Sequence, residues 1–210
     1  MVYPILKRLI AVPITKIWIG NLKGIQNIPK GKSFILAANH ISILDGFILS
    51  CLIVPMTDKR LHFYVKSKYF NKPVIGFFLN YSQCIPVFVE EHRNPELNKI
   101  AHDRALNYLK NGGIIGIFPE GKISNNGQLG NAKSGMGSLV FDSNLEVIPI
   151  AISTIHPIIG SKKFCAIFKD YNINIGSPIK FGPYTNEDKE KIIKDISKEV
   201  MKKIEFLLEM

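Results

Sequence analysis

The segment Phe34-Ile-Leu-Ala-Ala-Asn-His-Ile-Ser-Ile-Leu-Asp45-Gly46 joins an apolar run to a helical pattern and carries a histidine and an aspartate across the junction. Residues 34–38 form a continuous apolar run, which is typical of a buried strand. His40 and Asp45 are five positions apart, and on one straight helix their side chains would point about 140° away from each other. They meet only if His40 lies in a loop and Asp45 in the first turn of the next helix, for which Ser42 is the predicted N-cap.

This arrangement allows a catalytic interpretation. The Asp45 carboxylate accepts a hydrogen bond from one imidazole nitrogen of His40, and the other nitrogen is free to take a proton from a hydroxyl group. The same residues also allow a structural interpretation. Ser42-x-x-Asp45 is close to a capping box, in which the acidic side chain bonds the N–H of the cap residue and His40 is an ordinary loop residue. Asn39 is either a turn residue or a donor to the reacting carbonyl.

Two later segments favour the catalytic interpretation. Phe118-Pro-Glu-Gly-Lys-Ile-Ser124 follows another apolar run, and Val147-Ile-Pro149-Ile150 comes next. In this order and at these spacings, the three blocks resemble the glycerolipid acyltransferase family, which includes the 1-acyl-glycerol-3-phosphate acyltransferases. The resemblance covers residues 30–155.

The resemblance implies an activity and two catalytic residues. A fatty acyl group would pass from an acyl-CoA or acyl carrier protein thioester to the free hydroxyl of a lysophospholipid, in phospholipid biosynthesis. His40 would be the general base and Asp45 the residue that orients it. No metal, cofactor or covalent acyl-enzyme is implied.

The block at residues 118–124 is where the family binds the phosphate and glycerol of the acceptor. Glu120, Gly121 and Ser124 match the family pattern, and Gly121 permits close approach of the backbone to a ligand. Family members commonly have Glu-Gly-Thr-Arg-Ser here. This chain has Ile123 at the arginine position and a cation one place earlier, Lys122, which cannot reproduce the two-pronged geometry of arginine.

Two other cations complete the predicted binding set. Lys133 resembles a downstream basic position of the family, and Arg93 is the nearest candidate for a second family arginine, whose expected place holds Glu90 and Glu91. Each cation has an ordinary solvated role as its alternative. The acceptor therefore stays open between a lysophospholipid and a non-phosphorylated aminolipid or glycolipid. A basic membrane-binding or nucleic-acid-binding protein without catalysis is the alternative from another class.

Composition limits the class of protein. Hydrophobic residues make up 46% and charged residues 21% of 210 residues, and the net charge is +10. These values exclude a disordered chain and favour anionic partners. The three cysteines lie far apart without metal-ligand spacing, which predicts reduced, buried thiols. We expect a peripheral protein on the cytoplasmic face of a membrane, without a signal peptide, a membrane span or a nucleic-acid partner.

The first 22 residues are a predicted amphipathic segment. Apolar residues surround Lys7, Arg8 and Lys16, and Trp18 is the only tryptophan of the chain. Such a pattern is typical of helices that lie in a membrane interface. The alternative is that the segment packs on the protein's own core. Residues 23–210 are the predicted acyltransferase domain, and the sequence gives no oligomeric state.

Apolar runs alternate with helical patterns along the rest of the chain. Strands are predicted at 34–38, 60–66, 84–89, 114–118, 147–152, 164–168 and 171–175. Helices are predicted at 73–81, 94–111 and 132–141, from about residue 44 and from about residue 185. This alternation predicts an α/β fold with a mostly parallel sheet flanked by helices. His40 and Glu120 would then follow the carboxyl ends of two strands, where such sheets place their sites.

Overall fold

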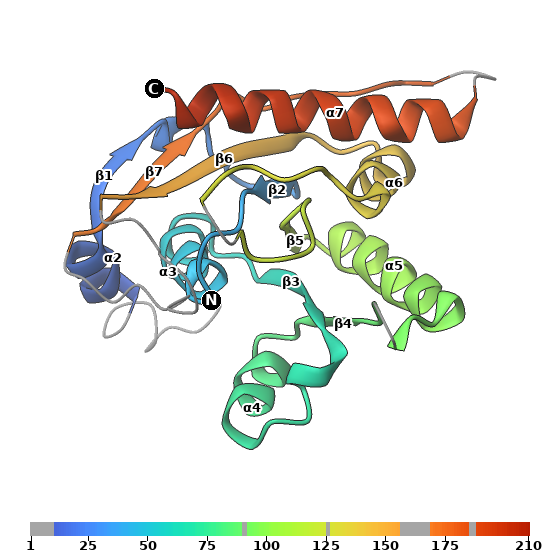
Figure 1. Cartoon of the computed structure of the whole chain (residues 1–210), viewed down its shortest axis with the longest axis horizontal. Helices are drawn as coiled ribbons and strands as arrows, with labels where there is room; N and C mark the ends of the chain where they lie inside the picture. Colours follow the sequence, from blue (N-terminus) through green and yellow to red (C-terminus); the bar gives the residue numbers. More distant parts are fainter. Residues whose placement is uncertain (1–10, 90–91, 125–126, 156–168, 185–187) are drawn as a thin grey trace.

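The structure is a computed structural model that describes residues 11–89, 92–124, 127–155, 169–184 and 188–210. A seven-stranded sheet runs through the molecule in the order β1-β7-β6-β2-β5-β3-β4 (Figure 1). Its strands are β1 (Ile19–Lys23), β2 (Ile35–Ala38), β3 (Leu61–Lys66), β4 (Ile85–Val87), β5 (Ile114–Ile117), β6 (Val147–Thr154) and β7 (Tyr171–Ile175). All neighbours are parallel except β6 and β7. The predicted α/β class and mostly parallel sheet are confirmed.

Helices cover both faces of this sheet. Successive side chains of a strand point to opposite faces, so Ile35 and Ala37 pack on one side of β2, and Leu36 and Ala38 on the other. Helices α5 (Pro95–Lys110), α6 (Ser134–Ser143) and α7 (Lys189–Leu208) cover the first face, and α3 (Asp45–Thr57) covers the second. Because the central strands are buried on both sides, they read as continuous apolar runs.

The predicted helices are present, α4 (Pro73–Tyr81) with the predicted bounds and the others with shifted ends. The Asn94 side chain caps α5 by accepting from the Leu97 N–H at 3.0 Å. Ala101, Ala105 and Leu109 are buried, whereas the Leu97 side chain is exposed. The last helix buries one apolar face: Ile192, Ile193, Ile196, Val200, Ile204 and Leu207. The predicted strand at 164–168 lies outside the described residues.

The N-terminal part of the described chain packs on the body of the protein. Helix α2 (Val12–Trp18) lies against α3, and the rings of Trp18 and Phe47 are 6.3 Å apart. Strand β1 follows at once and pairs with β7. The predicted boundary after residue 22 therefore falls inside a strand. Association of residues 1–22 with a membrane stays a prediction, and residues 1–10 lie outside the described ranges.

Several loops meet at one edge of the sheet. Strands β2, β3, β5 and β6 are parallel, so their carboxyl ends open on the same side. Strand β2 leads to His40 and β5 leads to Glu120. Strand β3 leads to the short helix η3 (Ser67–Tyr69) and then to α4 (Pro73–Tyr81). The loops that carry His40 and Glu120 thus come together at the edge where α/β sheets bind their ligands.

Candidate active site

His40 and Asp45 are in contact. His40 lies in the loop after β2, Asp45 is the first residue of α3, and His40 Nδ1 is 2.8 Å from Asp45 Oδ2. Because an ionised carboxylate only accepts hydrogen bonds, Nδ1 carries the proton and Nε2 is left as the basic nitrogen. The Asp45 side chain is fully buried, whereas 18% of the His40 side chain is exposed. The predicted placement of both residues is present, and their catalytic roles stay predictions.

Asp45 also fixes the backbone of the loop. Its Oδ2 accepts from the N–H groups of Ile41 and Ser42, each at 2.8 Å. One oxygen thus makes both the His40 contact that the catalytic interpretation needs and the Ser42 N–H bond that the capping interpretation expects. Ser42 is not the N-cap: the helix begins later, and Ser42 Oγ instead accepts from the Leu44 N–H at 3.2 Å.

Asn39 ties the start of this loop to the neighbouring strand. Its Nδ2 donates to the Ile152 carbonyl at 2.8 Å, and its Oδ1 accepts from the Ile152 N–H at 2.7 Å. The side chain is buried, and both ends of its amide are used by β6. Asn39 thus positions the backbone before His40, as the structural interpretation expects.

An aromatic stack holds the imidazole from one side. The rings of His40 and Phe118 are 4.0 Å apart and nearly parallel, and Phe118 in turn stacks on Phe63 with centroids 5.3 Å apart. Sequence analysis placed Phe118 only in a family block and did not find this contact. The available signal was a bulky aromatic residue at the end of the predicted strand 114–118, whose carboxyl end was expected at the same edge of the sheet as that of the strand before His40.

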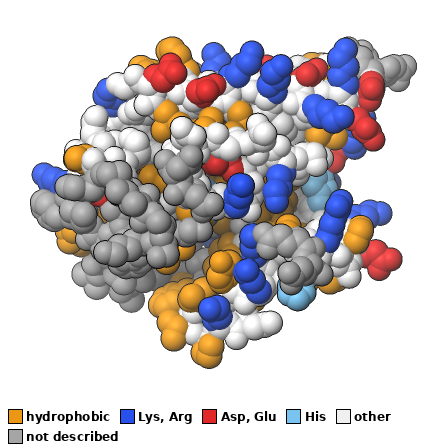
Figure 2. Space-filling model, viewed as in Figure 1, with side chains coloured by type: hydrophobic (Ala, Val, Ile, Leu, Met, Phe, Trp, Pro, Cys, Tyr) orange, Lys and Arg blue, Asp and Glu red, His pale blue; other side chains and the backbone are white. Residues whose placement is uncertain are grey.

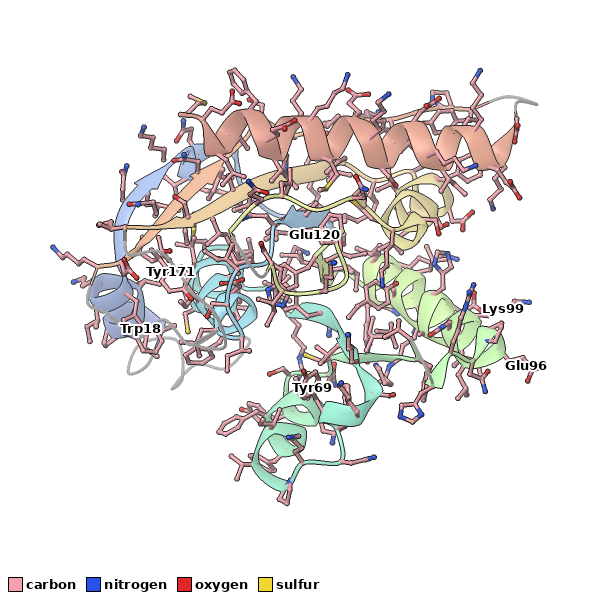
Figure 3. The ribbon with its side chains drawn as sticks, viewed as in Figure 1. Trp18, Tyr69, Glu96, Lys99, Glu120 and Tyr171 are labelled. Atoms are coloured by element: carbon pink, nitrogen blue, oxygen red, sulfur yellow. The ribbon has the colours of Figure 1, made fainter. Side chains whose placement is uncertain are left out.

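Glu120 joins three loop segments. Its Oε1 accepts from the His40 N–H at 3.0 Å, and its Oε2 accepts from the Gly130 N–H at 2.9 Å. The Ser124 N–H adds a bond of 2.7 Å to the His40 carbonyl. Glu120 is buried in the middle of the molecule (Figure 3). Its bonds position the His40 backbone, and a contact with substrate stays a prediction.

Gly121 and Lys133 lie side by side. Gly121 has a φ of +66°, and a Cβ at this position would lie 3.0 Å from Lys133 Cδ. Only glycine adopts this backbone conformation without strain and leaves that space to the lysine stem. The Lys133 N–H donates to the Pro119 carbonyl at 2.9 Å, and Lys133 immediately precedes α6. An exposed ammonium group and the N-terminus of a helix thus lie beside the Glu120 loop.

The other predicted binding residues differ in position. Lys122 follows Gly121 and is exposed, and Ser124 Oγ donates to the Gln128 carbonyl at 2.9 Å. Arg93 is exposed between β4 and α5. Strands β5 and β3 separate β4 from β2, and the described contacts do not bring Arg93 to the His40 loop. The structure therefore brings together His40, Asp45, Glu120, Gly121, Ser124 and Lys133, but not Arg93.

Two other histidines have structural surroundings. His62 is buried, stacks on Tyr108 at 3.9 Å, and its Nδ1 lies 3.1 Å from the Gln83 carbonyl. Burial, chiefly, lowers the pKa of His62 below its ordinary value. His102 pairs with Asp142 at 2.9 Å, which ties α5 to α6.

Asp142 holds Lys189 as well, at 2.8 Å. Partial burial raises the pKa of Asp142, but the hydrogen bonds and charges of Lys189 and His102 outweigh it and leave the pKa below its ordinary value. Together these contacts link α5, α6 and α7.

The cysteines of the described chain are free and buried. Burial raises the pKa of the Cys51 thiol to about 12 and also raises that of Cys84. Cys165 lies outside the described residues. Within the described ranges, His, Cys, Asp and Glu form no group of three that could hold a metal ion. None of the described helices combines the length and the apolar character that crossing a membrane requires.

Known proteins share this sequence pattern and fold. The family model described as Acyltransferase matches residues 20–153. The chain is 28% identical over 133 residues to a chloroplast 1-acyl-sn-glycerol-3-phosphate acyltransferase of Arabidopsis thaliana, covering 63% of this chain and 35% of that one. It is 31% identical over 96 residues to the 1-acyl-sn-glycerol-3-phosphate acyltransferase of Bacillus subtilis, covering 46% and 44%. The chain thus spans less than half the length of these relatives.

A solved structure shares the fold. The 1-acyl-sn-glycerophosphate acyltransferase of Thermotoga maritima superposes with a TM-score of 0.61 over 90% of this chain and 73% of that one, at 22% identity. At this identity the similarity concerns the arrangement of the sheet and helices.

Proposed function

The chain belongs to the acyltransferase family, and from that premise we propose that it transfers a fatty acyl group from a thioester to the free hydroxyl of a lysophospholipid. The proposed acceptor is 1-acyl-glycerol-3-phosphate, and the proposed donor is acyl-CoA or acyl carrier protein. The contact of 2.8 Å between His40 Nδ1 and Asp45 Oδ2 is the observation that carries this proposal. It leaves a basic nitrogen at the edge of the sheet where the loops meet.

The chemistry requires a base because an alcohol holds its proton tightly at neutral pH. In the proposed step, His40 Nε2 takes the proton of the acceptor hydroxyl while its oxygen attacks the thioester carbonyl carbon. The C–S bond then breaks, the ester forms, and the proton passes from the imidazolium to the leaving thiolate. A buried carboxylate beside Nδ1 stabilises the imidazolium, and a positioned base of this kind contributes about 10²–10⁴-fold in rate.

The surroundings of Gly121 support recognition of an anionic headgroup. Lys133 crosses Gly121, Lys122 is the next residue, and the N-terminus of α6 adds a partial positive charge. In this proposal Gly121, Lys122, Ser124 and Lys133 contact the acceptor, and Glu120 acts mainly through the backbone of His40. Arg93 is the weakest member of the set, because two strands separate its strand from β2.

A second acceptor class follows from Ile123. An uncharged side chain stands where the family commonly has arginine, so a non-phosphorylated aminolipid or glycolipid is the alternative acceptor. Lys122→Gln/Lys133→Gln separates the two. A large rise in acceptor KM supports phosphate recognition, and an unchanged KM supports the alternative. Lys198→Gln/Lys202→Gln on α7 removes the same charge away from the site and serves as the control.

We place the proposed enzyme at the cytoplasmic face of a membrane as a peripheral protein, because its proposed acceptor is a lipid. The direct test incubates the pure protein with a panel of lysolipids and with acyl-CoA or acyl carrier protein, and identifies products by mass spectrometry. Ester formation that is lost in His40→Ala supports the proposal. No product with any acceptor refutes it and favours a basic membrane-binding protein without catalysis.

A further inference from the structure

Helix α4 exposes nearly its whole apolar side. Gly76 is its only buried residue. The exposed fractions are 69% for Val74, 65% for Phe77 and 61% for Phe78, and Ile75 and Tyr81 are exposed by about half. Figure 2 shows hydrophobic side chains gathered at the lower end of the molecule, where α4 lies in Figure 1. An apolar cluster of this kind on a protein surface marks a site of interaction.

Helix α4 packs on the rest of the protein through a side that does not include this exposed apolar cluster. A Cβ on Gly76 would lie 2.1 Å from the Phe70 carbonyl oxygen, so only glycine lets the helix pack this closely on the preceding turn. Leu79 and Phe70 pack against the core. The aromatic rings on the outer side contact each other instead: Phe77 lies 5.6 Å from Phe78 and 6.4 Å from Tyr81. Their exposure is therefore not required by packing within the chain.

The charge around α4 has one sign. Residues 59–89 contain five Lys and Arg and no Asp or Glu. Lys72 precedes the helix, and Lys68 lies 5.7 Å from the ring of Tyr69. By contrast, the exposed face of α7 mixes lysines with acids, as in Lys189, Glu190, Lys198 and Glu199. The partner of α4 therefore has to offer an apolar interior and an anionic surface.

The order of side chains along this region fits a bilayer. Phe77 and Phe78 are the most exposed aromatic residues of the helix. Tyr69, which has a polar tip, precedes the helix (Figure 3), and Tyr81, which also has one, is its last residue. Lysines Lys66, Lys68 and Lys72 lie on the N-terminal side of the helix. Tyrosine and lysine favour the headgroup level, and phenylalanine favours the acyl boundary below it. An acidic protein partner would satisfy the lysines but would need a matching apolar groove for the whole helix.

The position of α4 relates the cluster to the active site. Helix α4 leaves the carboxyl end of β3, and His40 leaves the carboxyl end of β2, at the same edge of the sheet. Ile43 and Phe47, which follow His40, are also exposed, as is Ile155 after β6. A surface that receives α4 would thus face the edge that carries His40.

We propose that α4 is a docking helix whose aromatic face enters the headgroup–acyl boundary of an anionic lipid bilayer. This proposal rests on the proposed function in one respect, since a lipid acceptor explains why the protein would bind a bilayer. The binding itself can be measured without turnover. The test measures partitioning of the full chain onto vesicles of phosphatidylglycerol and phosphatidylcholine. Phe77→Ser/Phe78→Ser is compared with Phe206→Ser, which changes an equally exposed phenylalanine, 59%, on α7.

We expect the α4 variant to lose about tenfold or more in partitioning, because two phenylalanine side chains no longer leave water, and the α7 variant to bind like the natural sequence. Thermal melting by circular dichroism shows that both variants fold. Equal partitioning of the two variants overturns the proposal. So does a natural chain that does not bind vesicles, even if its α4 region binds an acidic carrier protein.

The charges supply a second arm. Lys68→Gln/Lys72→Gln is expected to weaken binding to phosphatidylglycerol vesicles several-fold, with a smaller loss at high salt, and to leave binding to pure phosphatidylcholine unchanged. Lys198→Gln/Lys202→Gln is the matched control. Transfer to a water-soluble short-chain acceptor should be the same in all these variants. Its absence in every protein would refute the proposed function without touching the docking proposal.

Discussion

The loop at residues 39–45 and helix α4 leave the same edge of the sheet but are held in opposite ways. In the loop, polar side chains bond to each other and to the backbone: Asp45 Oδ2 accepts three hydrogen bonds, and Glu120, from a neighbouring loop, accepts two. Among the described residues, only the second oxygen of Asp45, Oδ1, is left buried there without a partner. In α4, a single glycine is buried and the large apolar side chains face outward. The side chains of the loop fix its own conformation, whereas the large side chains of α4 are exposed and can contact a partner.

The comparison separates two requirements of one proposed reaction. Proton transfer needs an imidazole held within a fraction of an ångström, so its surroundings are over-determined by buried bonds and by the Phe118 ring. Docking to a fluid surface needs apolar area and few fixed contacts. Changes in the loop should therefore alter turnover and leave membrane binding intact, and changes in α4 should do the reverse.

The largest effect should come from His40→Ala. Loss of the base is expected to reduce acyl transfer by about 10²–10⁴-fold, measured as release of free thiol. Vesicle binding should equal that of the natural chain, because the described contacts of His40 involve no residue of α4. Turnover close to the natural rate would remove His40 from the mechanism, and a parallel loss of vesicle binding would break the comparison.

Glu120→Gln should have the next largest effect. The amide has to turn its NH₂ group toward the N–H of either His40 or Gly130, so one buried hydrogen bond is lost. A displaced His40 is expected to lower kcat by up to about 10²-fold with little change in acceptor KM. Glu146→Gln, which breaks a surface ion pair with Lys32, is the control. A raised KM at constant kcat would instead mean that Glu120 contacts the acceptor.

Gly76→Ala tests how α4 is seated. The added Cβ would meet the Phe70 carbonyl oxygen at 2.1 Å, so the helix has to shift, and we expect a loss of about 1–3 kcal/mol in stability. Proteolysis of the native protein between residues 70 and 82 should become faster, while transfer to a soluble acceptor stays normal. Gly135→Ala on α6, where no atom lies within 4 Å, should be neutral. Equal effects would mean that Gly76 is not the point of attachment.

The smallest effect concerns the pH dependence of stability and rests on the buried histidine His62. Burial lowers the pKa of His62 in the folded state, so the unfolded chain binds the proton more readily. The stability that neutral His62 contributes to the folded state is therefore fully present above the ordinary histidine pKa. It is lost as the pH falls below that value, because the unfolded chain then takes up the proton first. Between about pH 7 and about pH 5, His62→Gln should therefore lose less stability on acidification than the natural chain. Denaturant midpoints measure this difference, and identical slopes would contradict it.

Sequence reasoning succeeded where one local pattern had one physical reading. The apolar runs at 34–38 and 114–118 could only be buried strands, and their common direction brought His40 and Glu120 to one edge. The same reasoning placed α4 at Pro73–Tyr81 but did not say which side would be buried, because its residues are apolar all around. Which side of α4 is buried depends on the close approach of Gly76 to the Phe70 backbone. A contact between two backbone segments produces no periodic pattern of apolar residues in the sequence.

Long-range contacts set the other limit. Asp45 was expected to orient His40 or to bond the N–H of Ser42, and its Oδ2 makes both contacts, although Ser42 is not the N-cap. Glu120 was assigned to substrate because the family block suggests it, whereas its bonds reach His40 and Gly130. Neither bond is encoded in spacing along the chain. The start of β1 at Ile19, inside the predicted N-terminal segment, is a third example, since its partner β7 lies far away in the sequence.

The pairing of β1 with β7 has a consequence for the making of the protein. Ile19 aligns with Tyr171, so a ribosome that adds about 5–20 residues per second completes the partner roughly 8–30 s after the first strand. Through that interval the nascent β1 has open hydrogen-bonding groups and no neighbour to receive them. Correct assembly therefore depends on keeping an early strand from pairing with another chain, and truncations that cut into β7 should yield insoluble product.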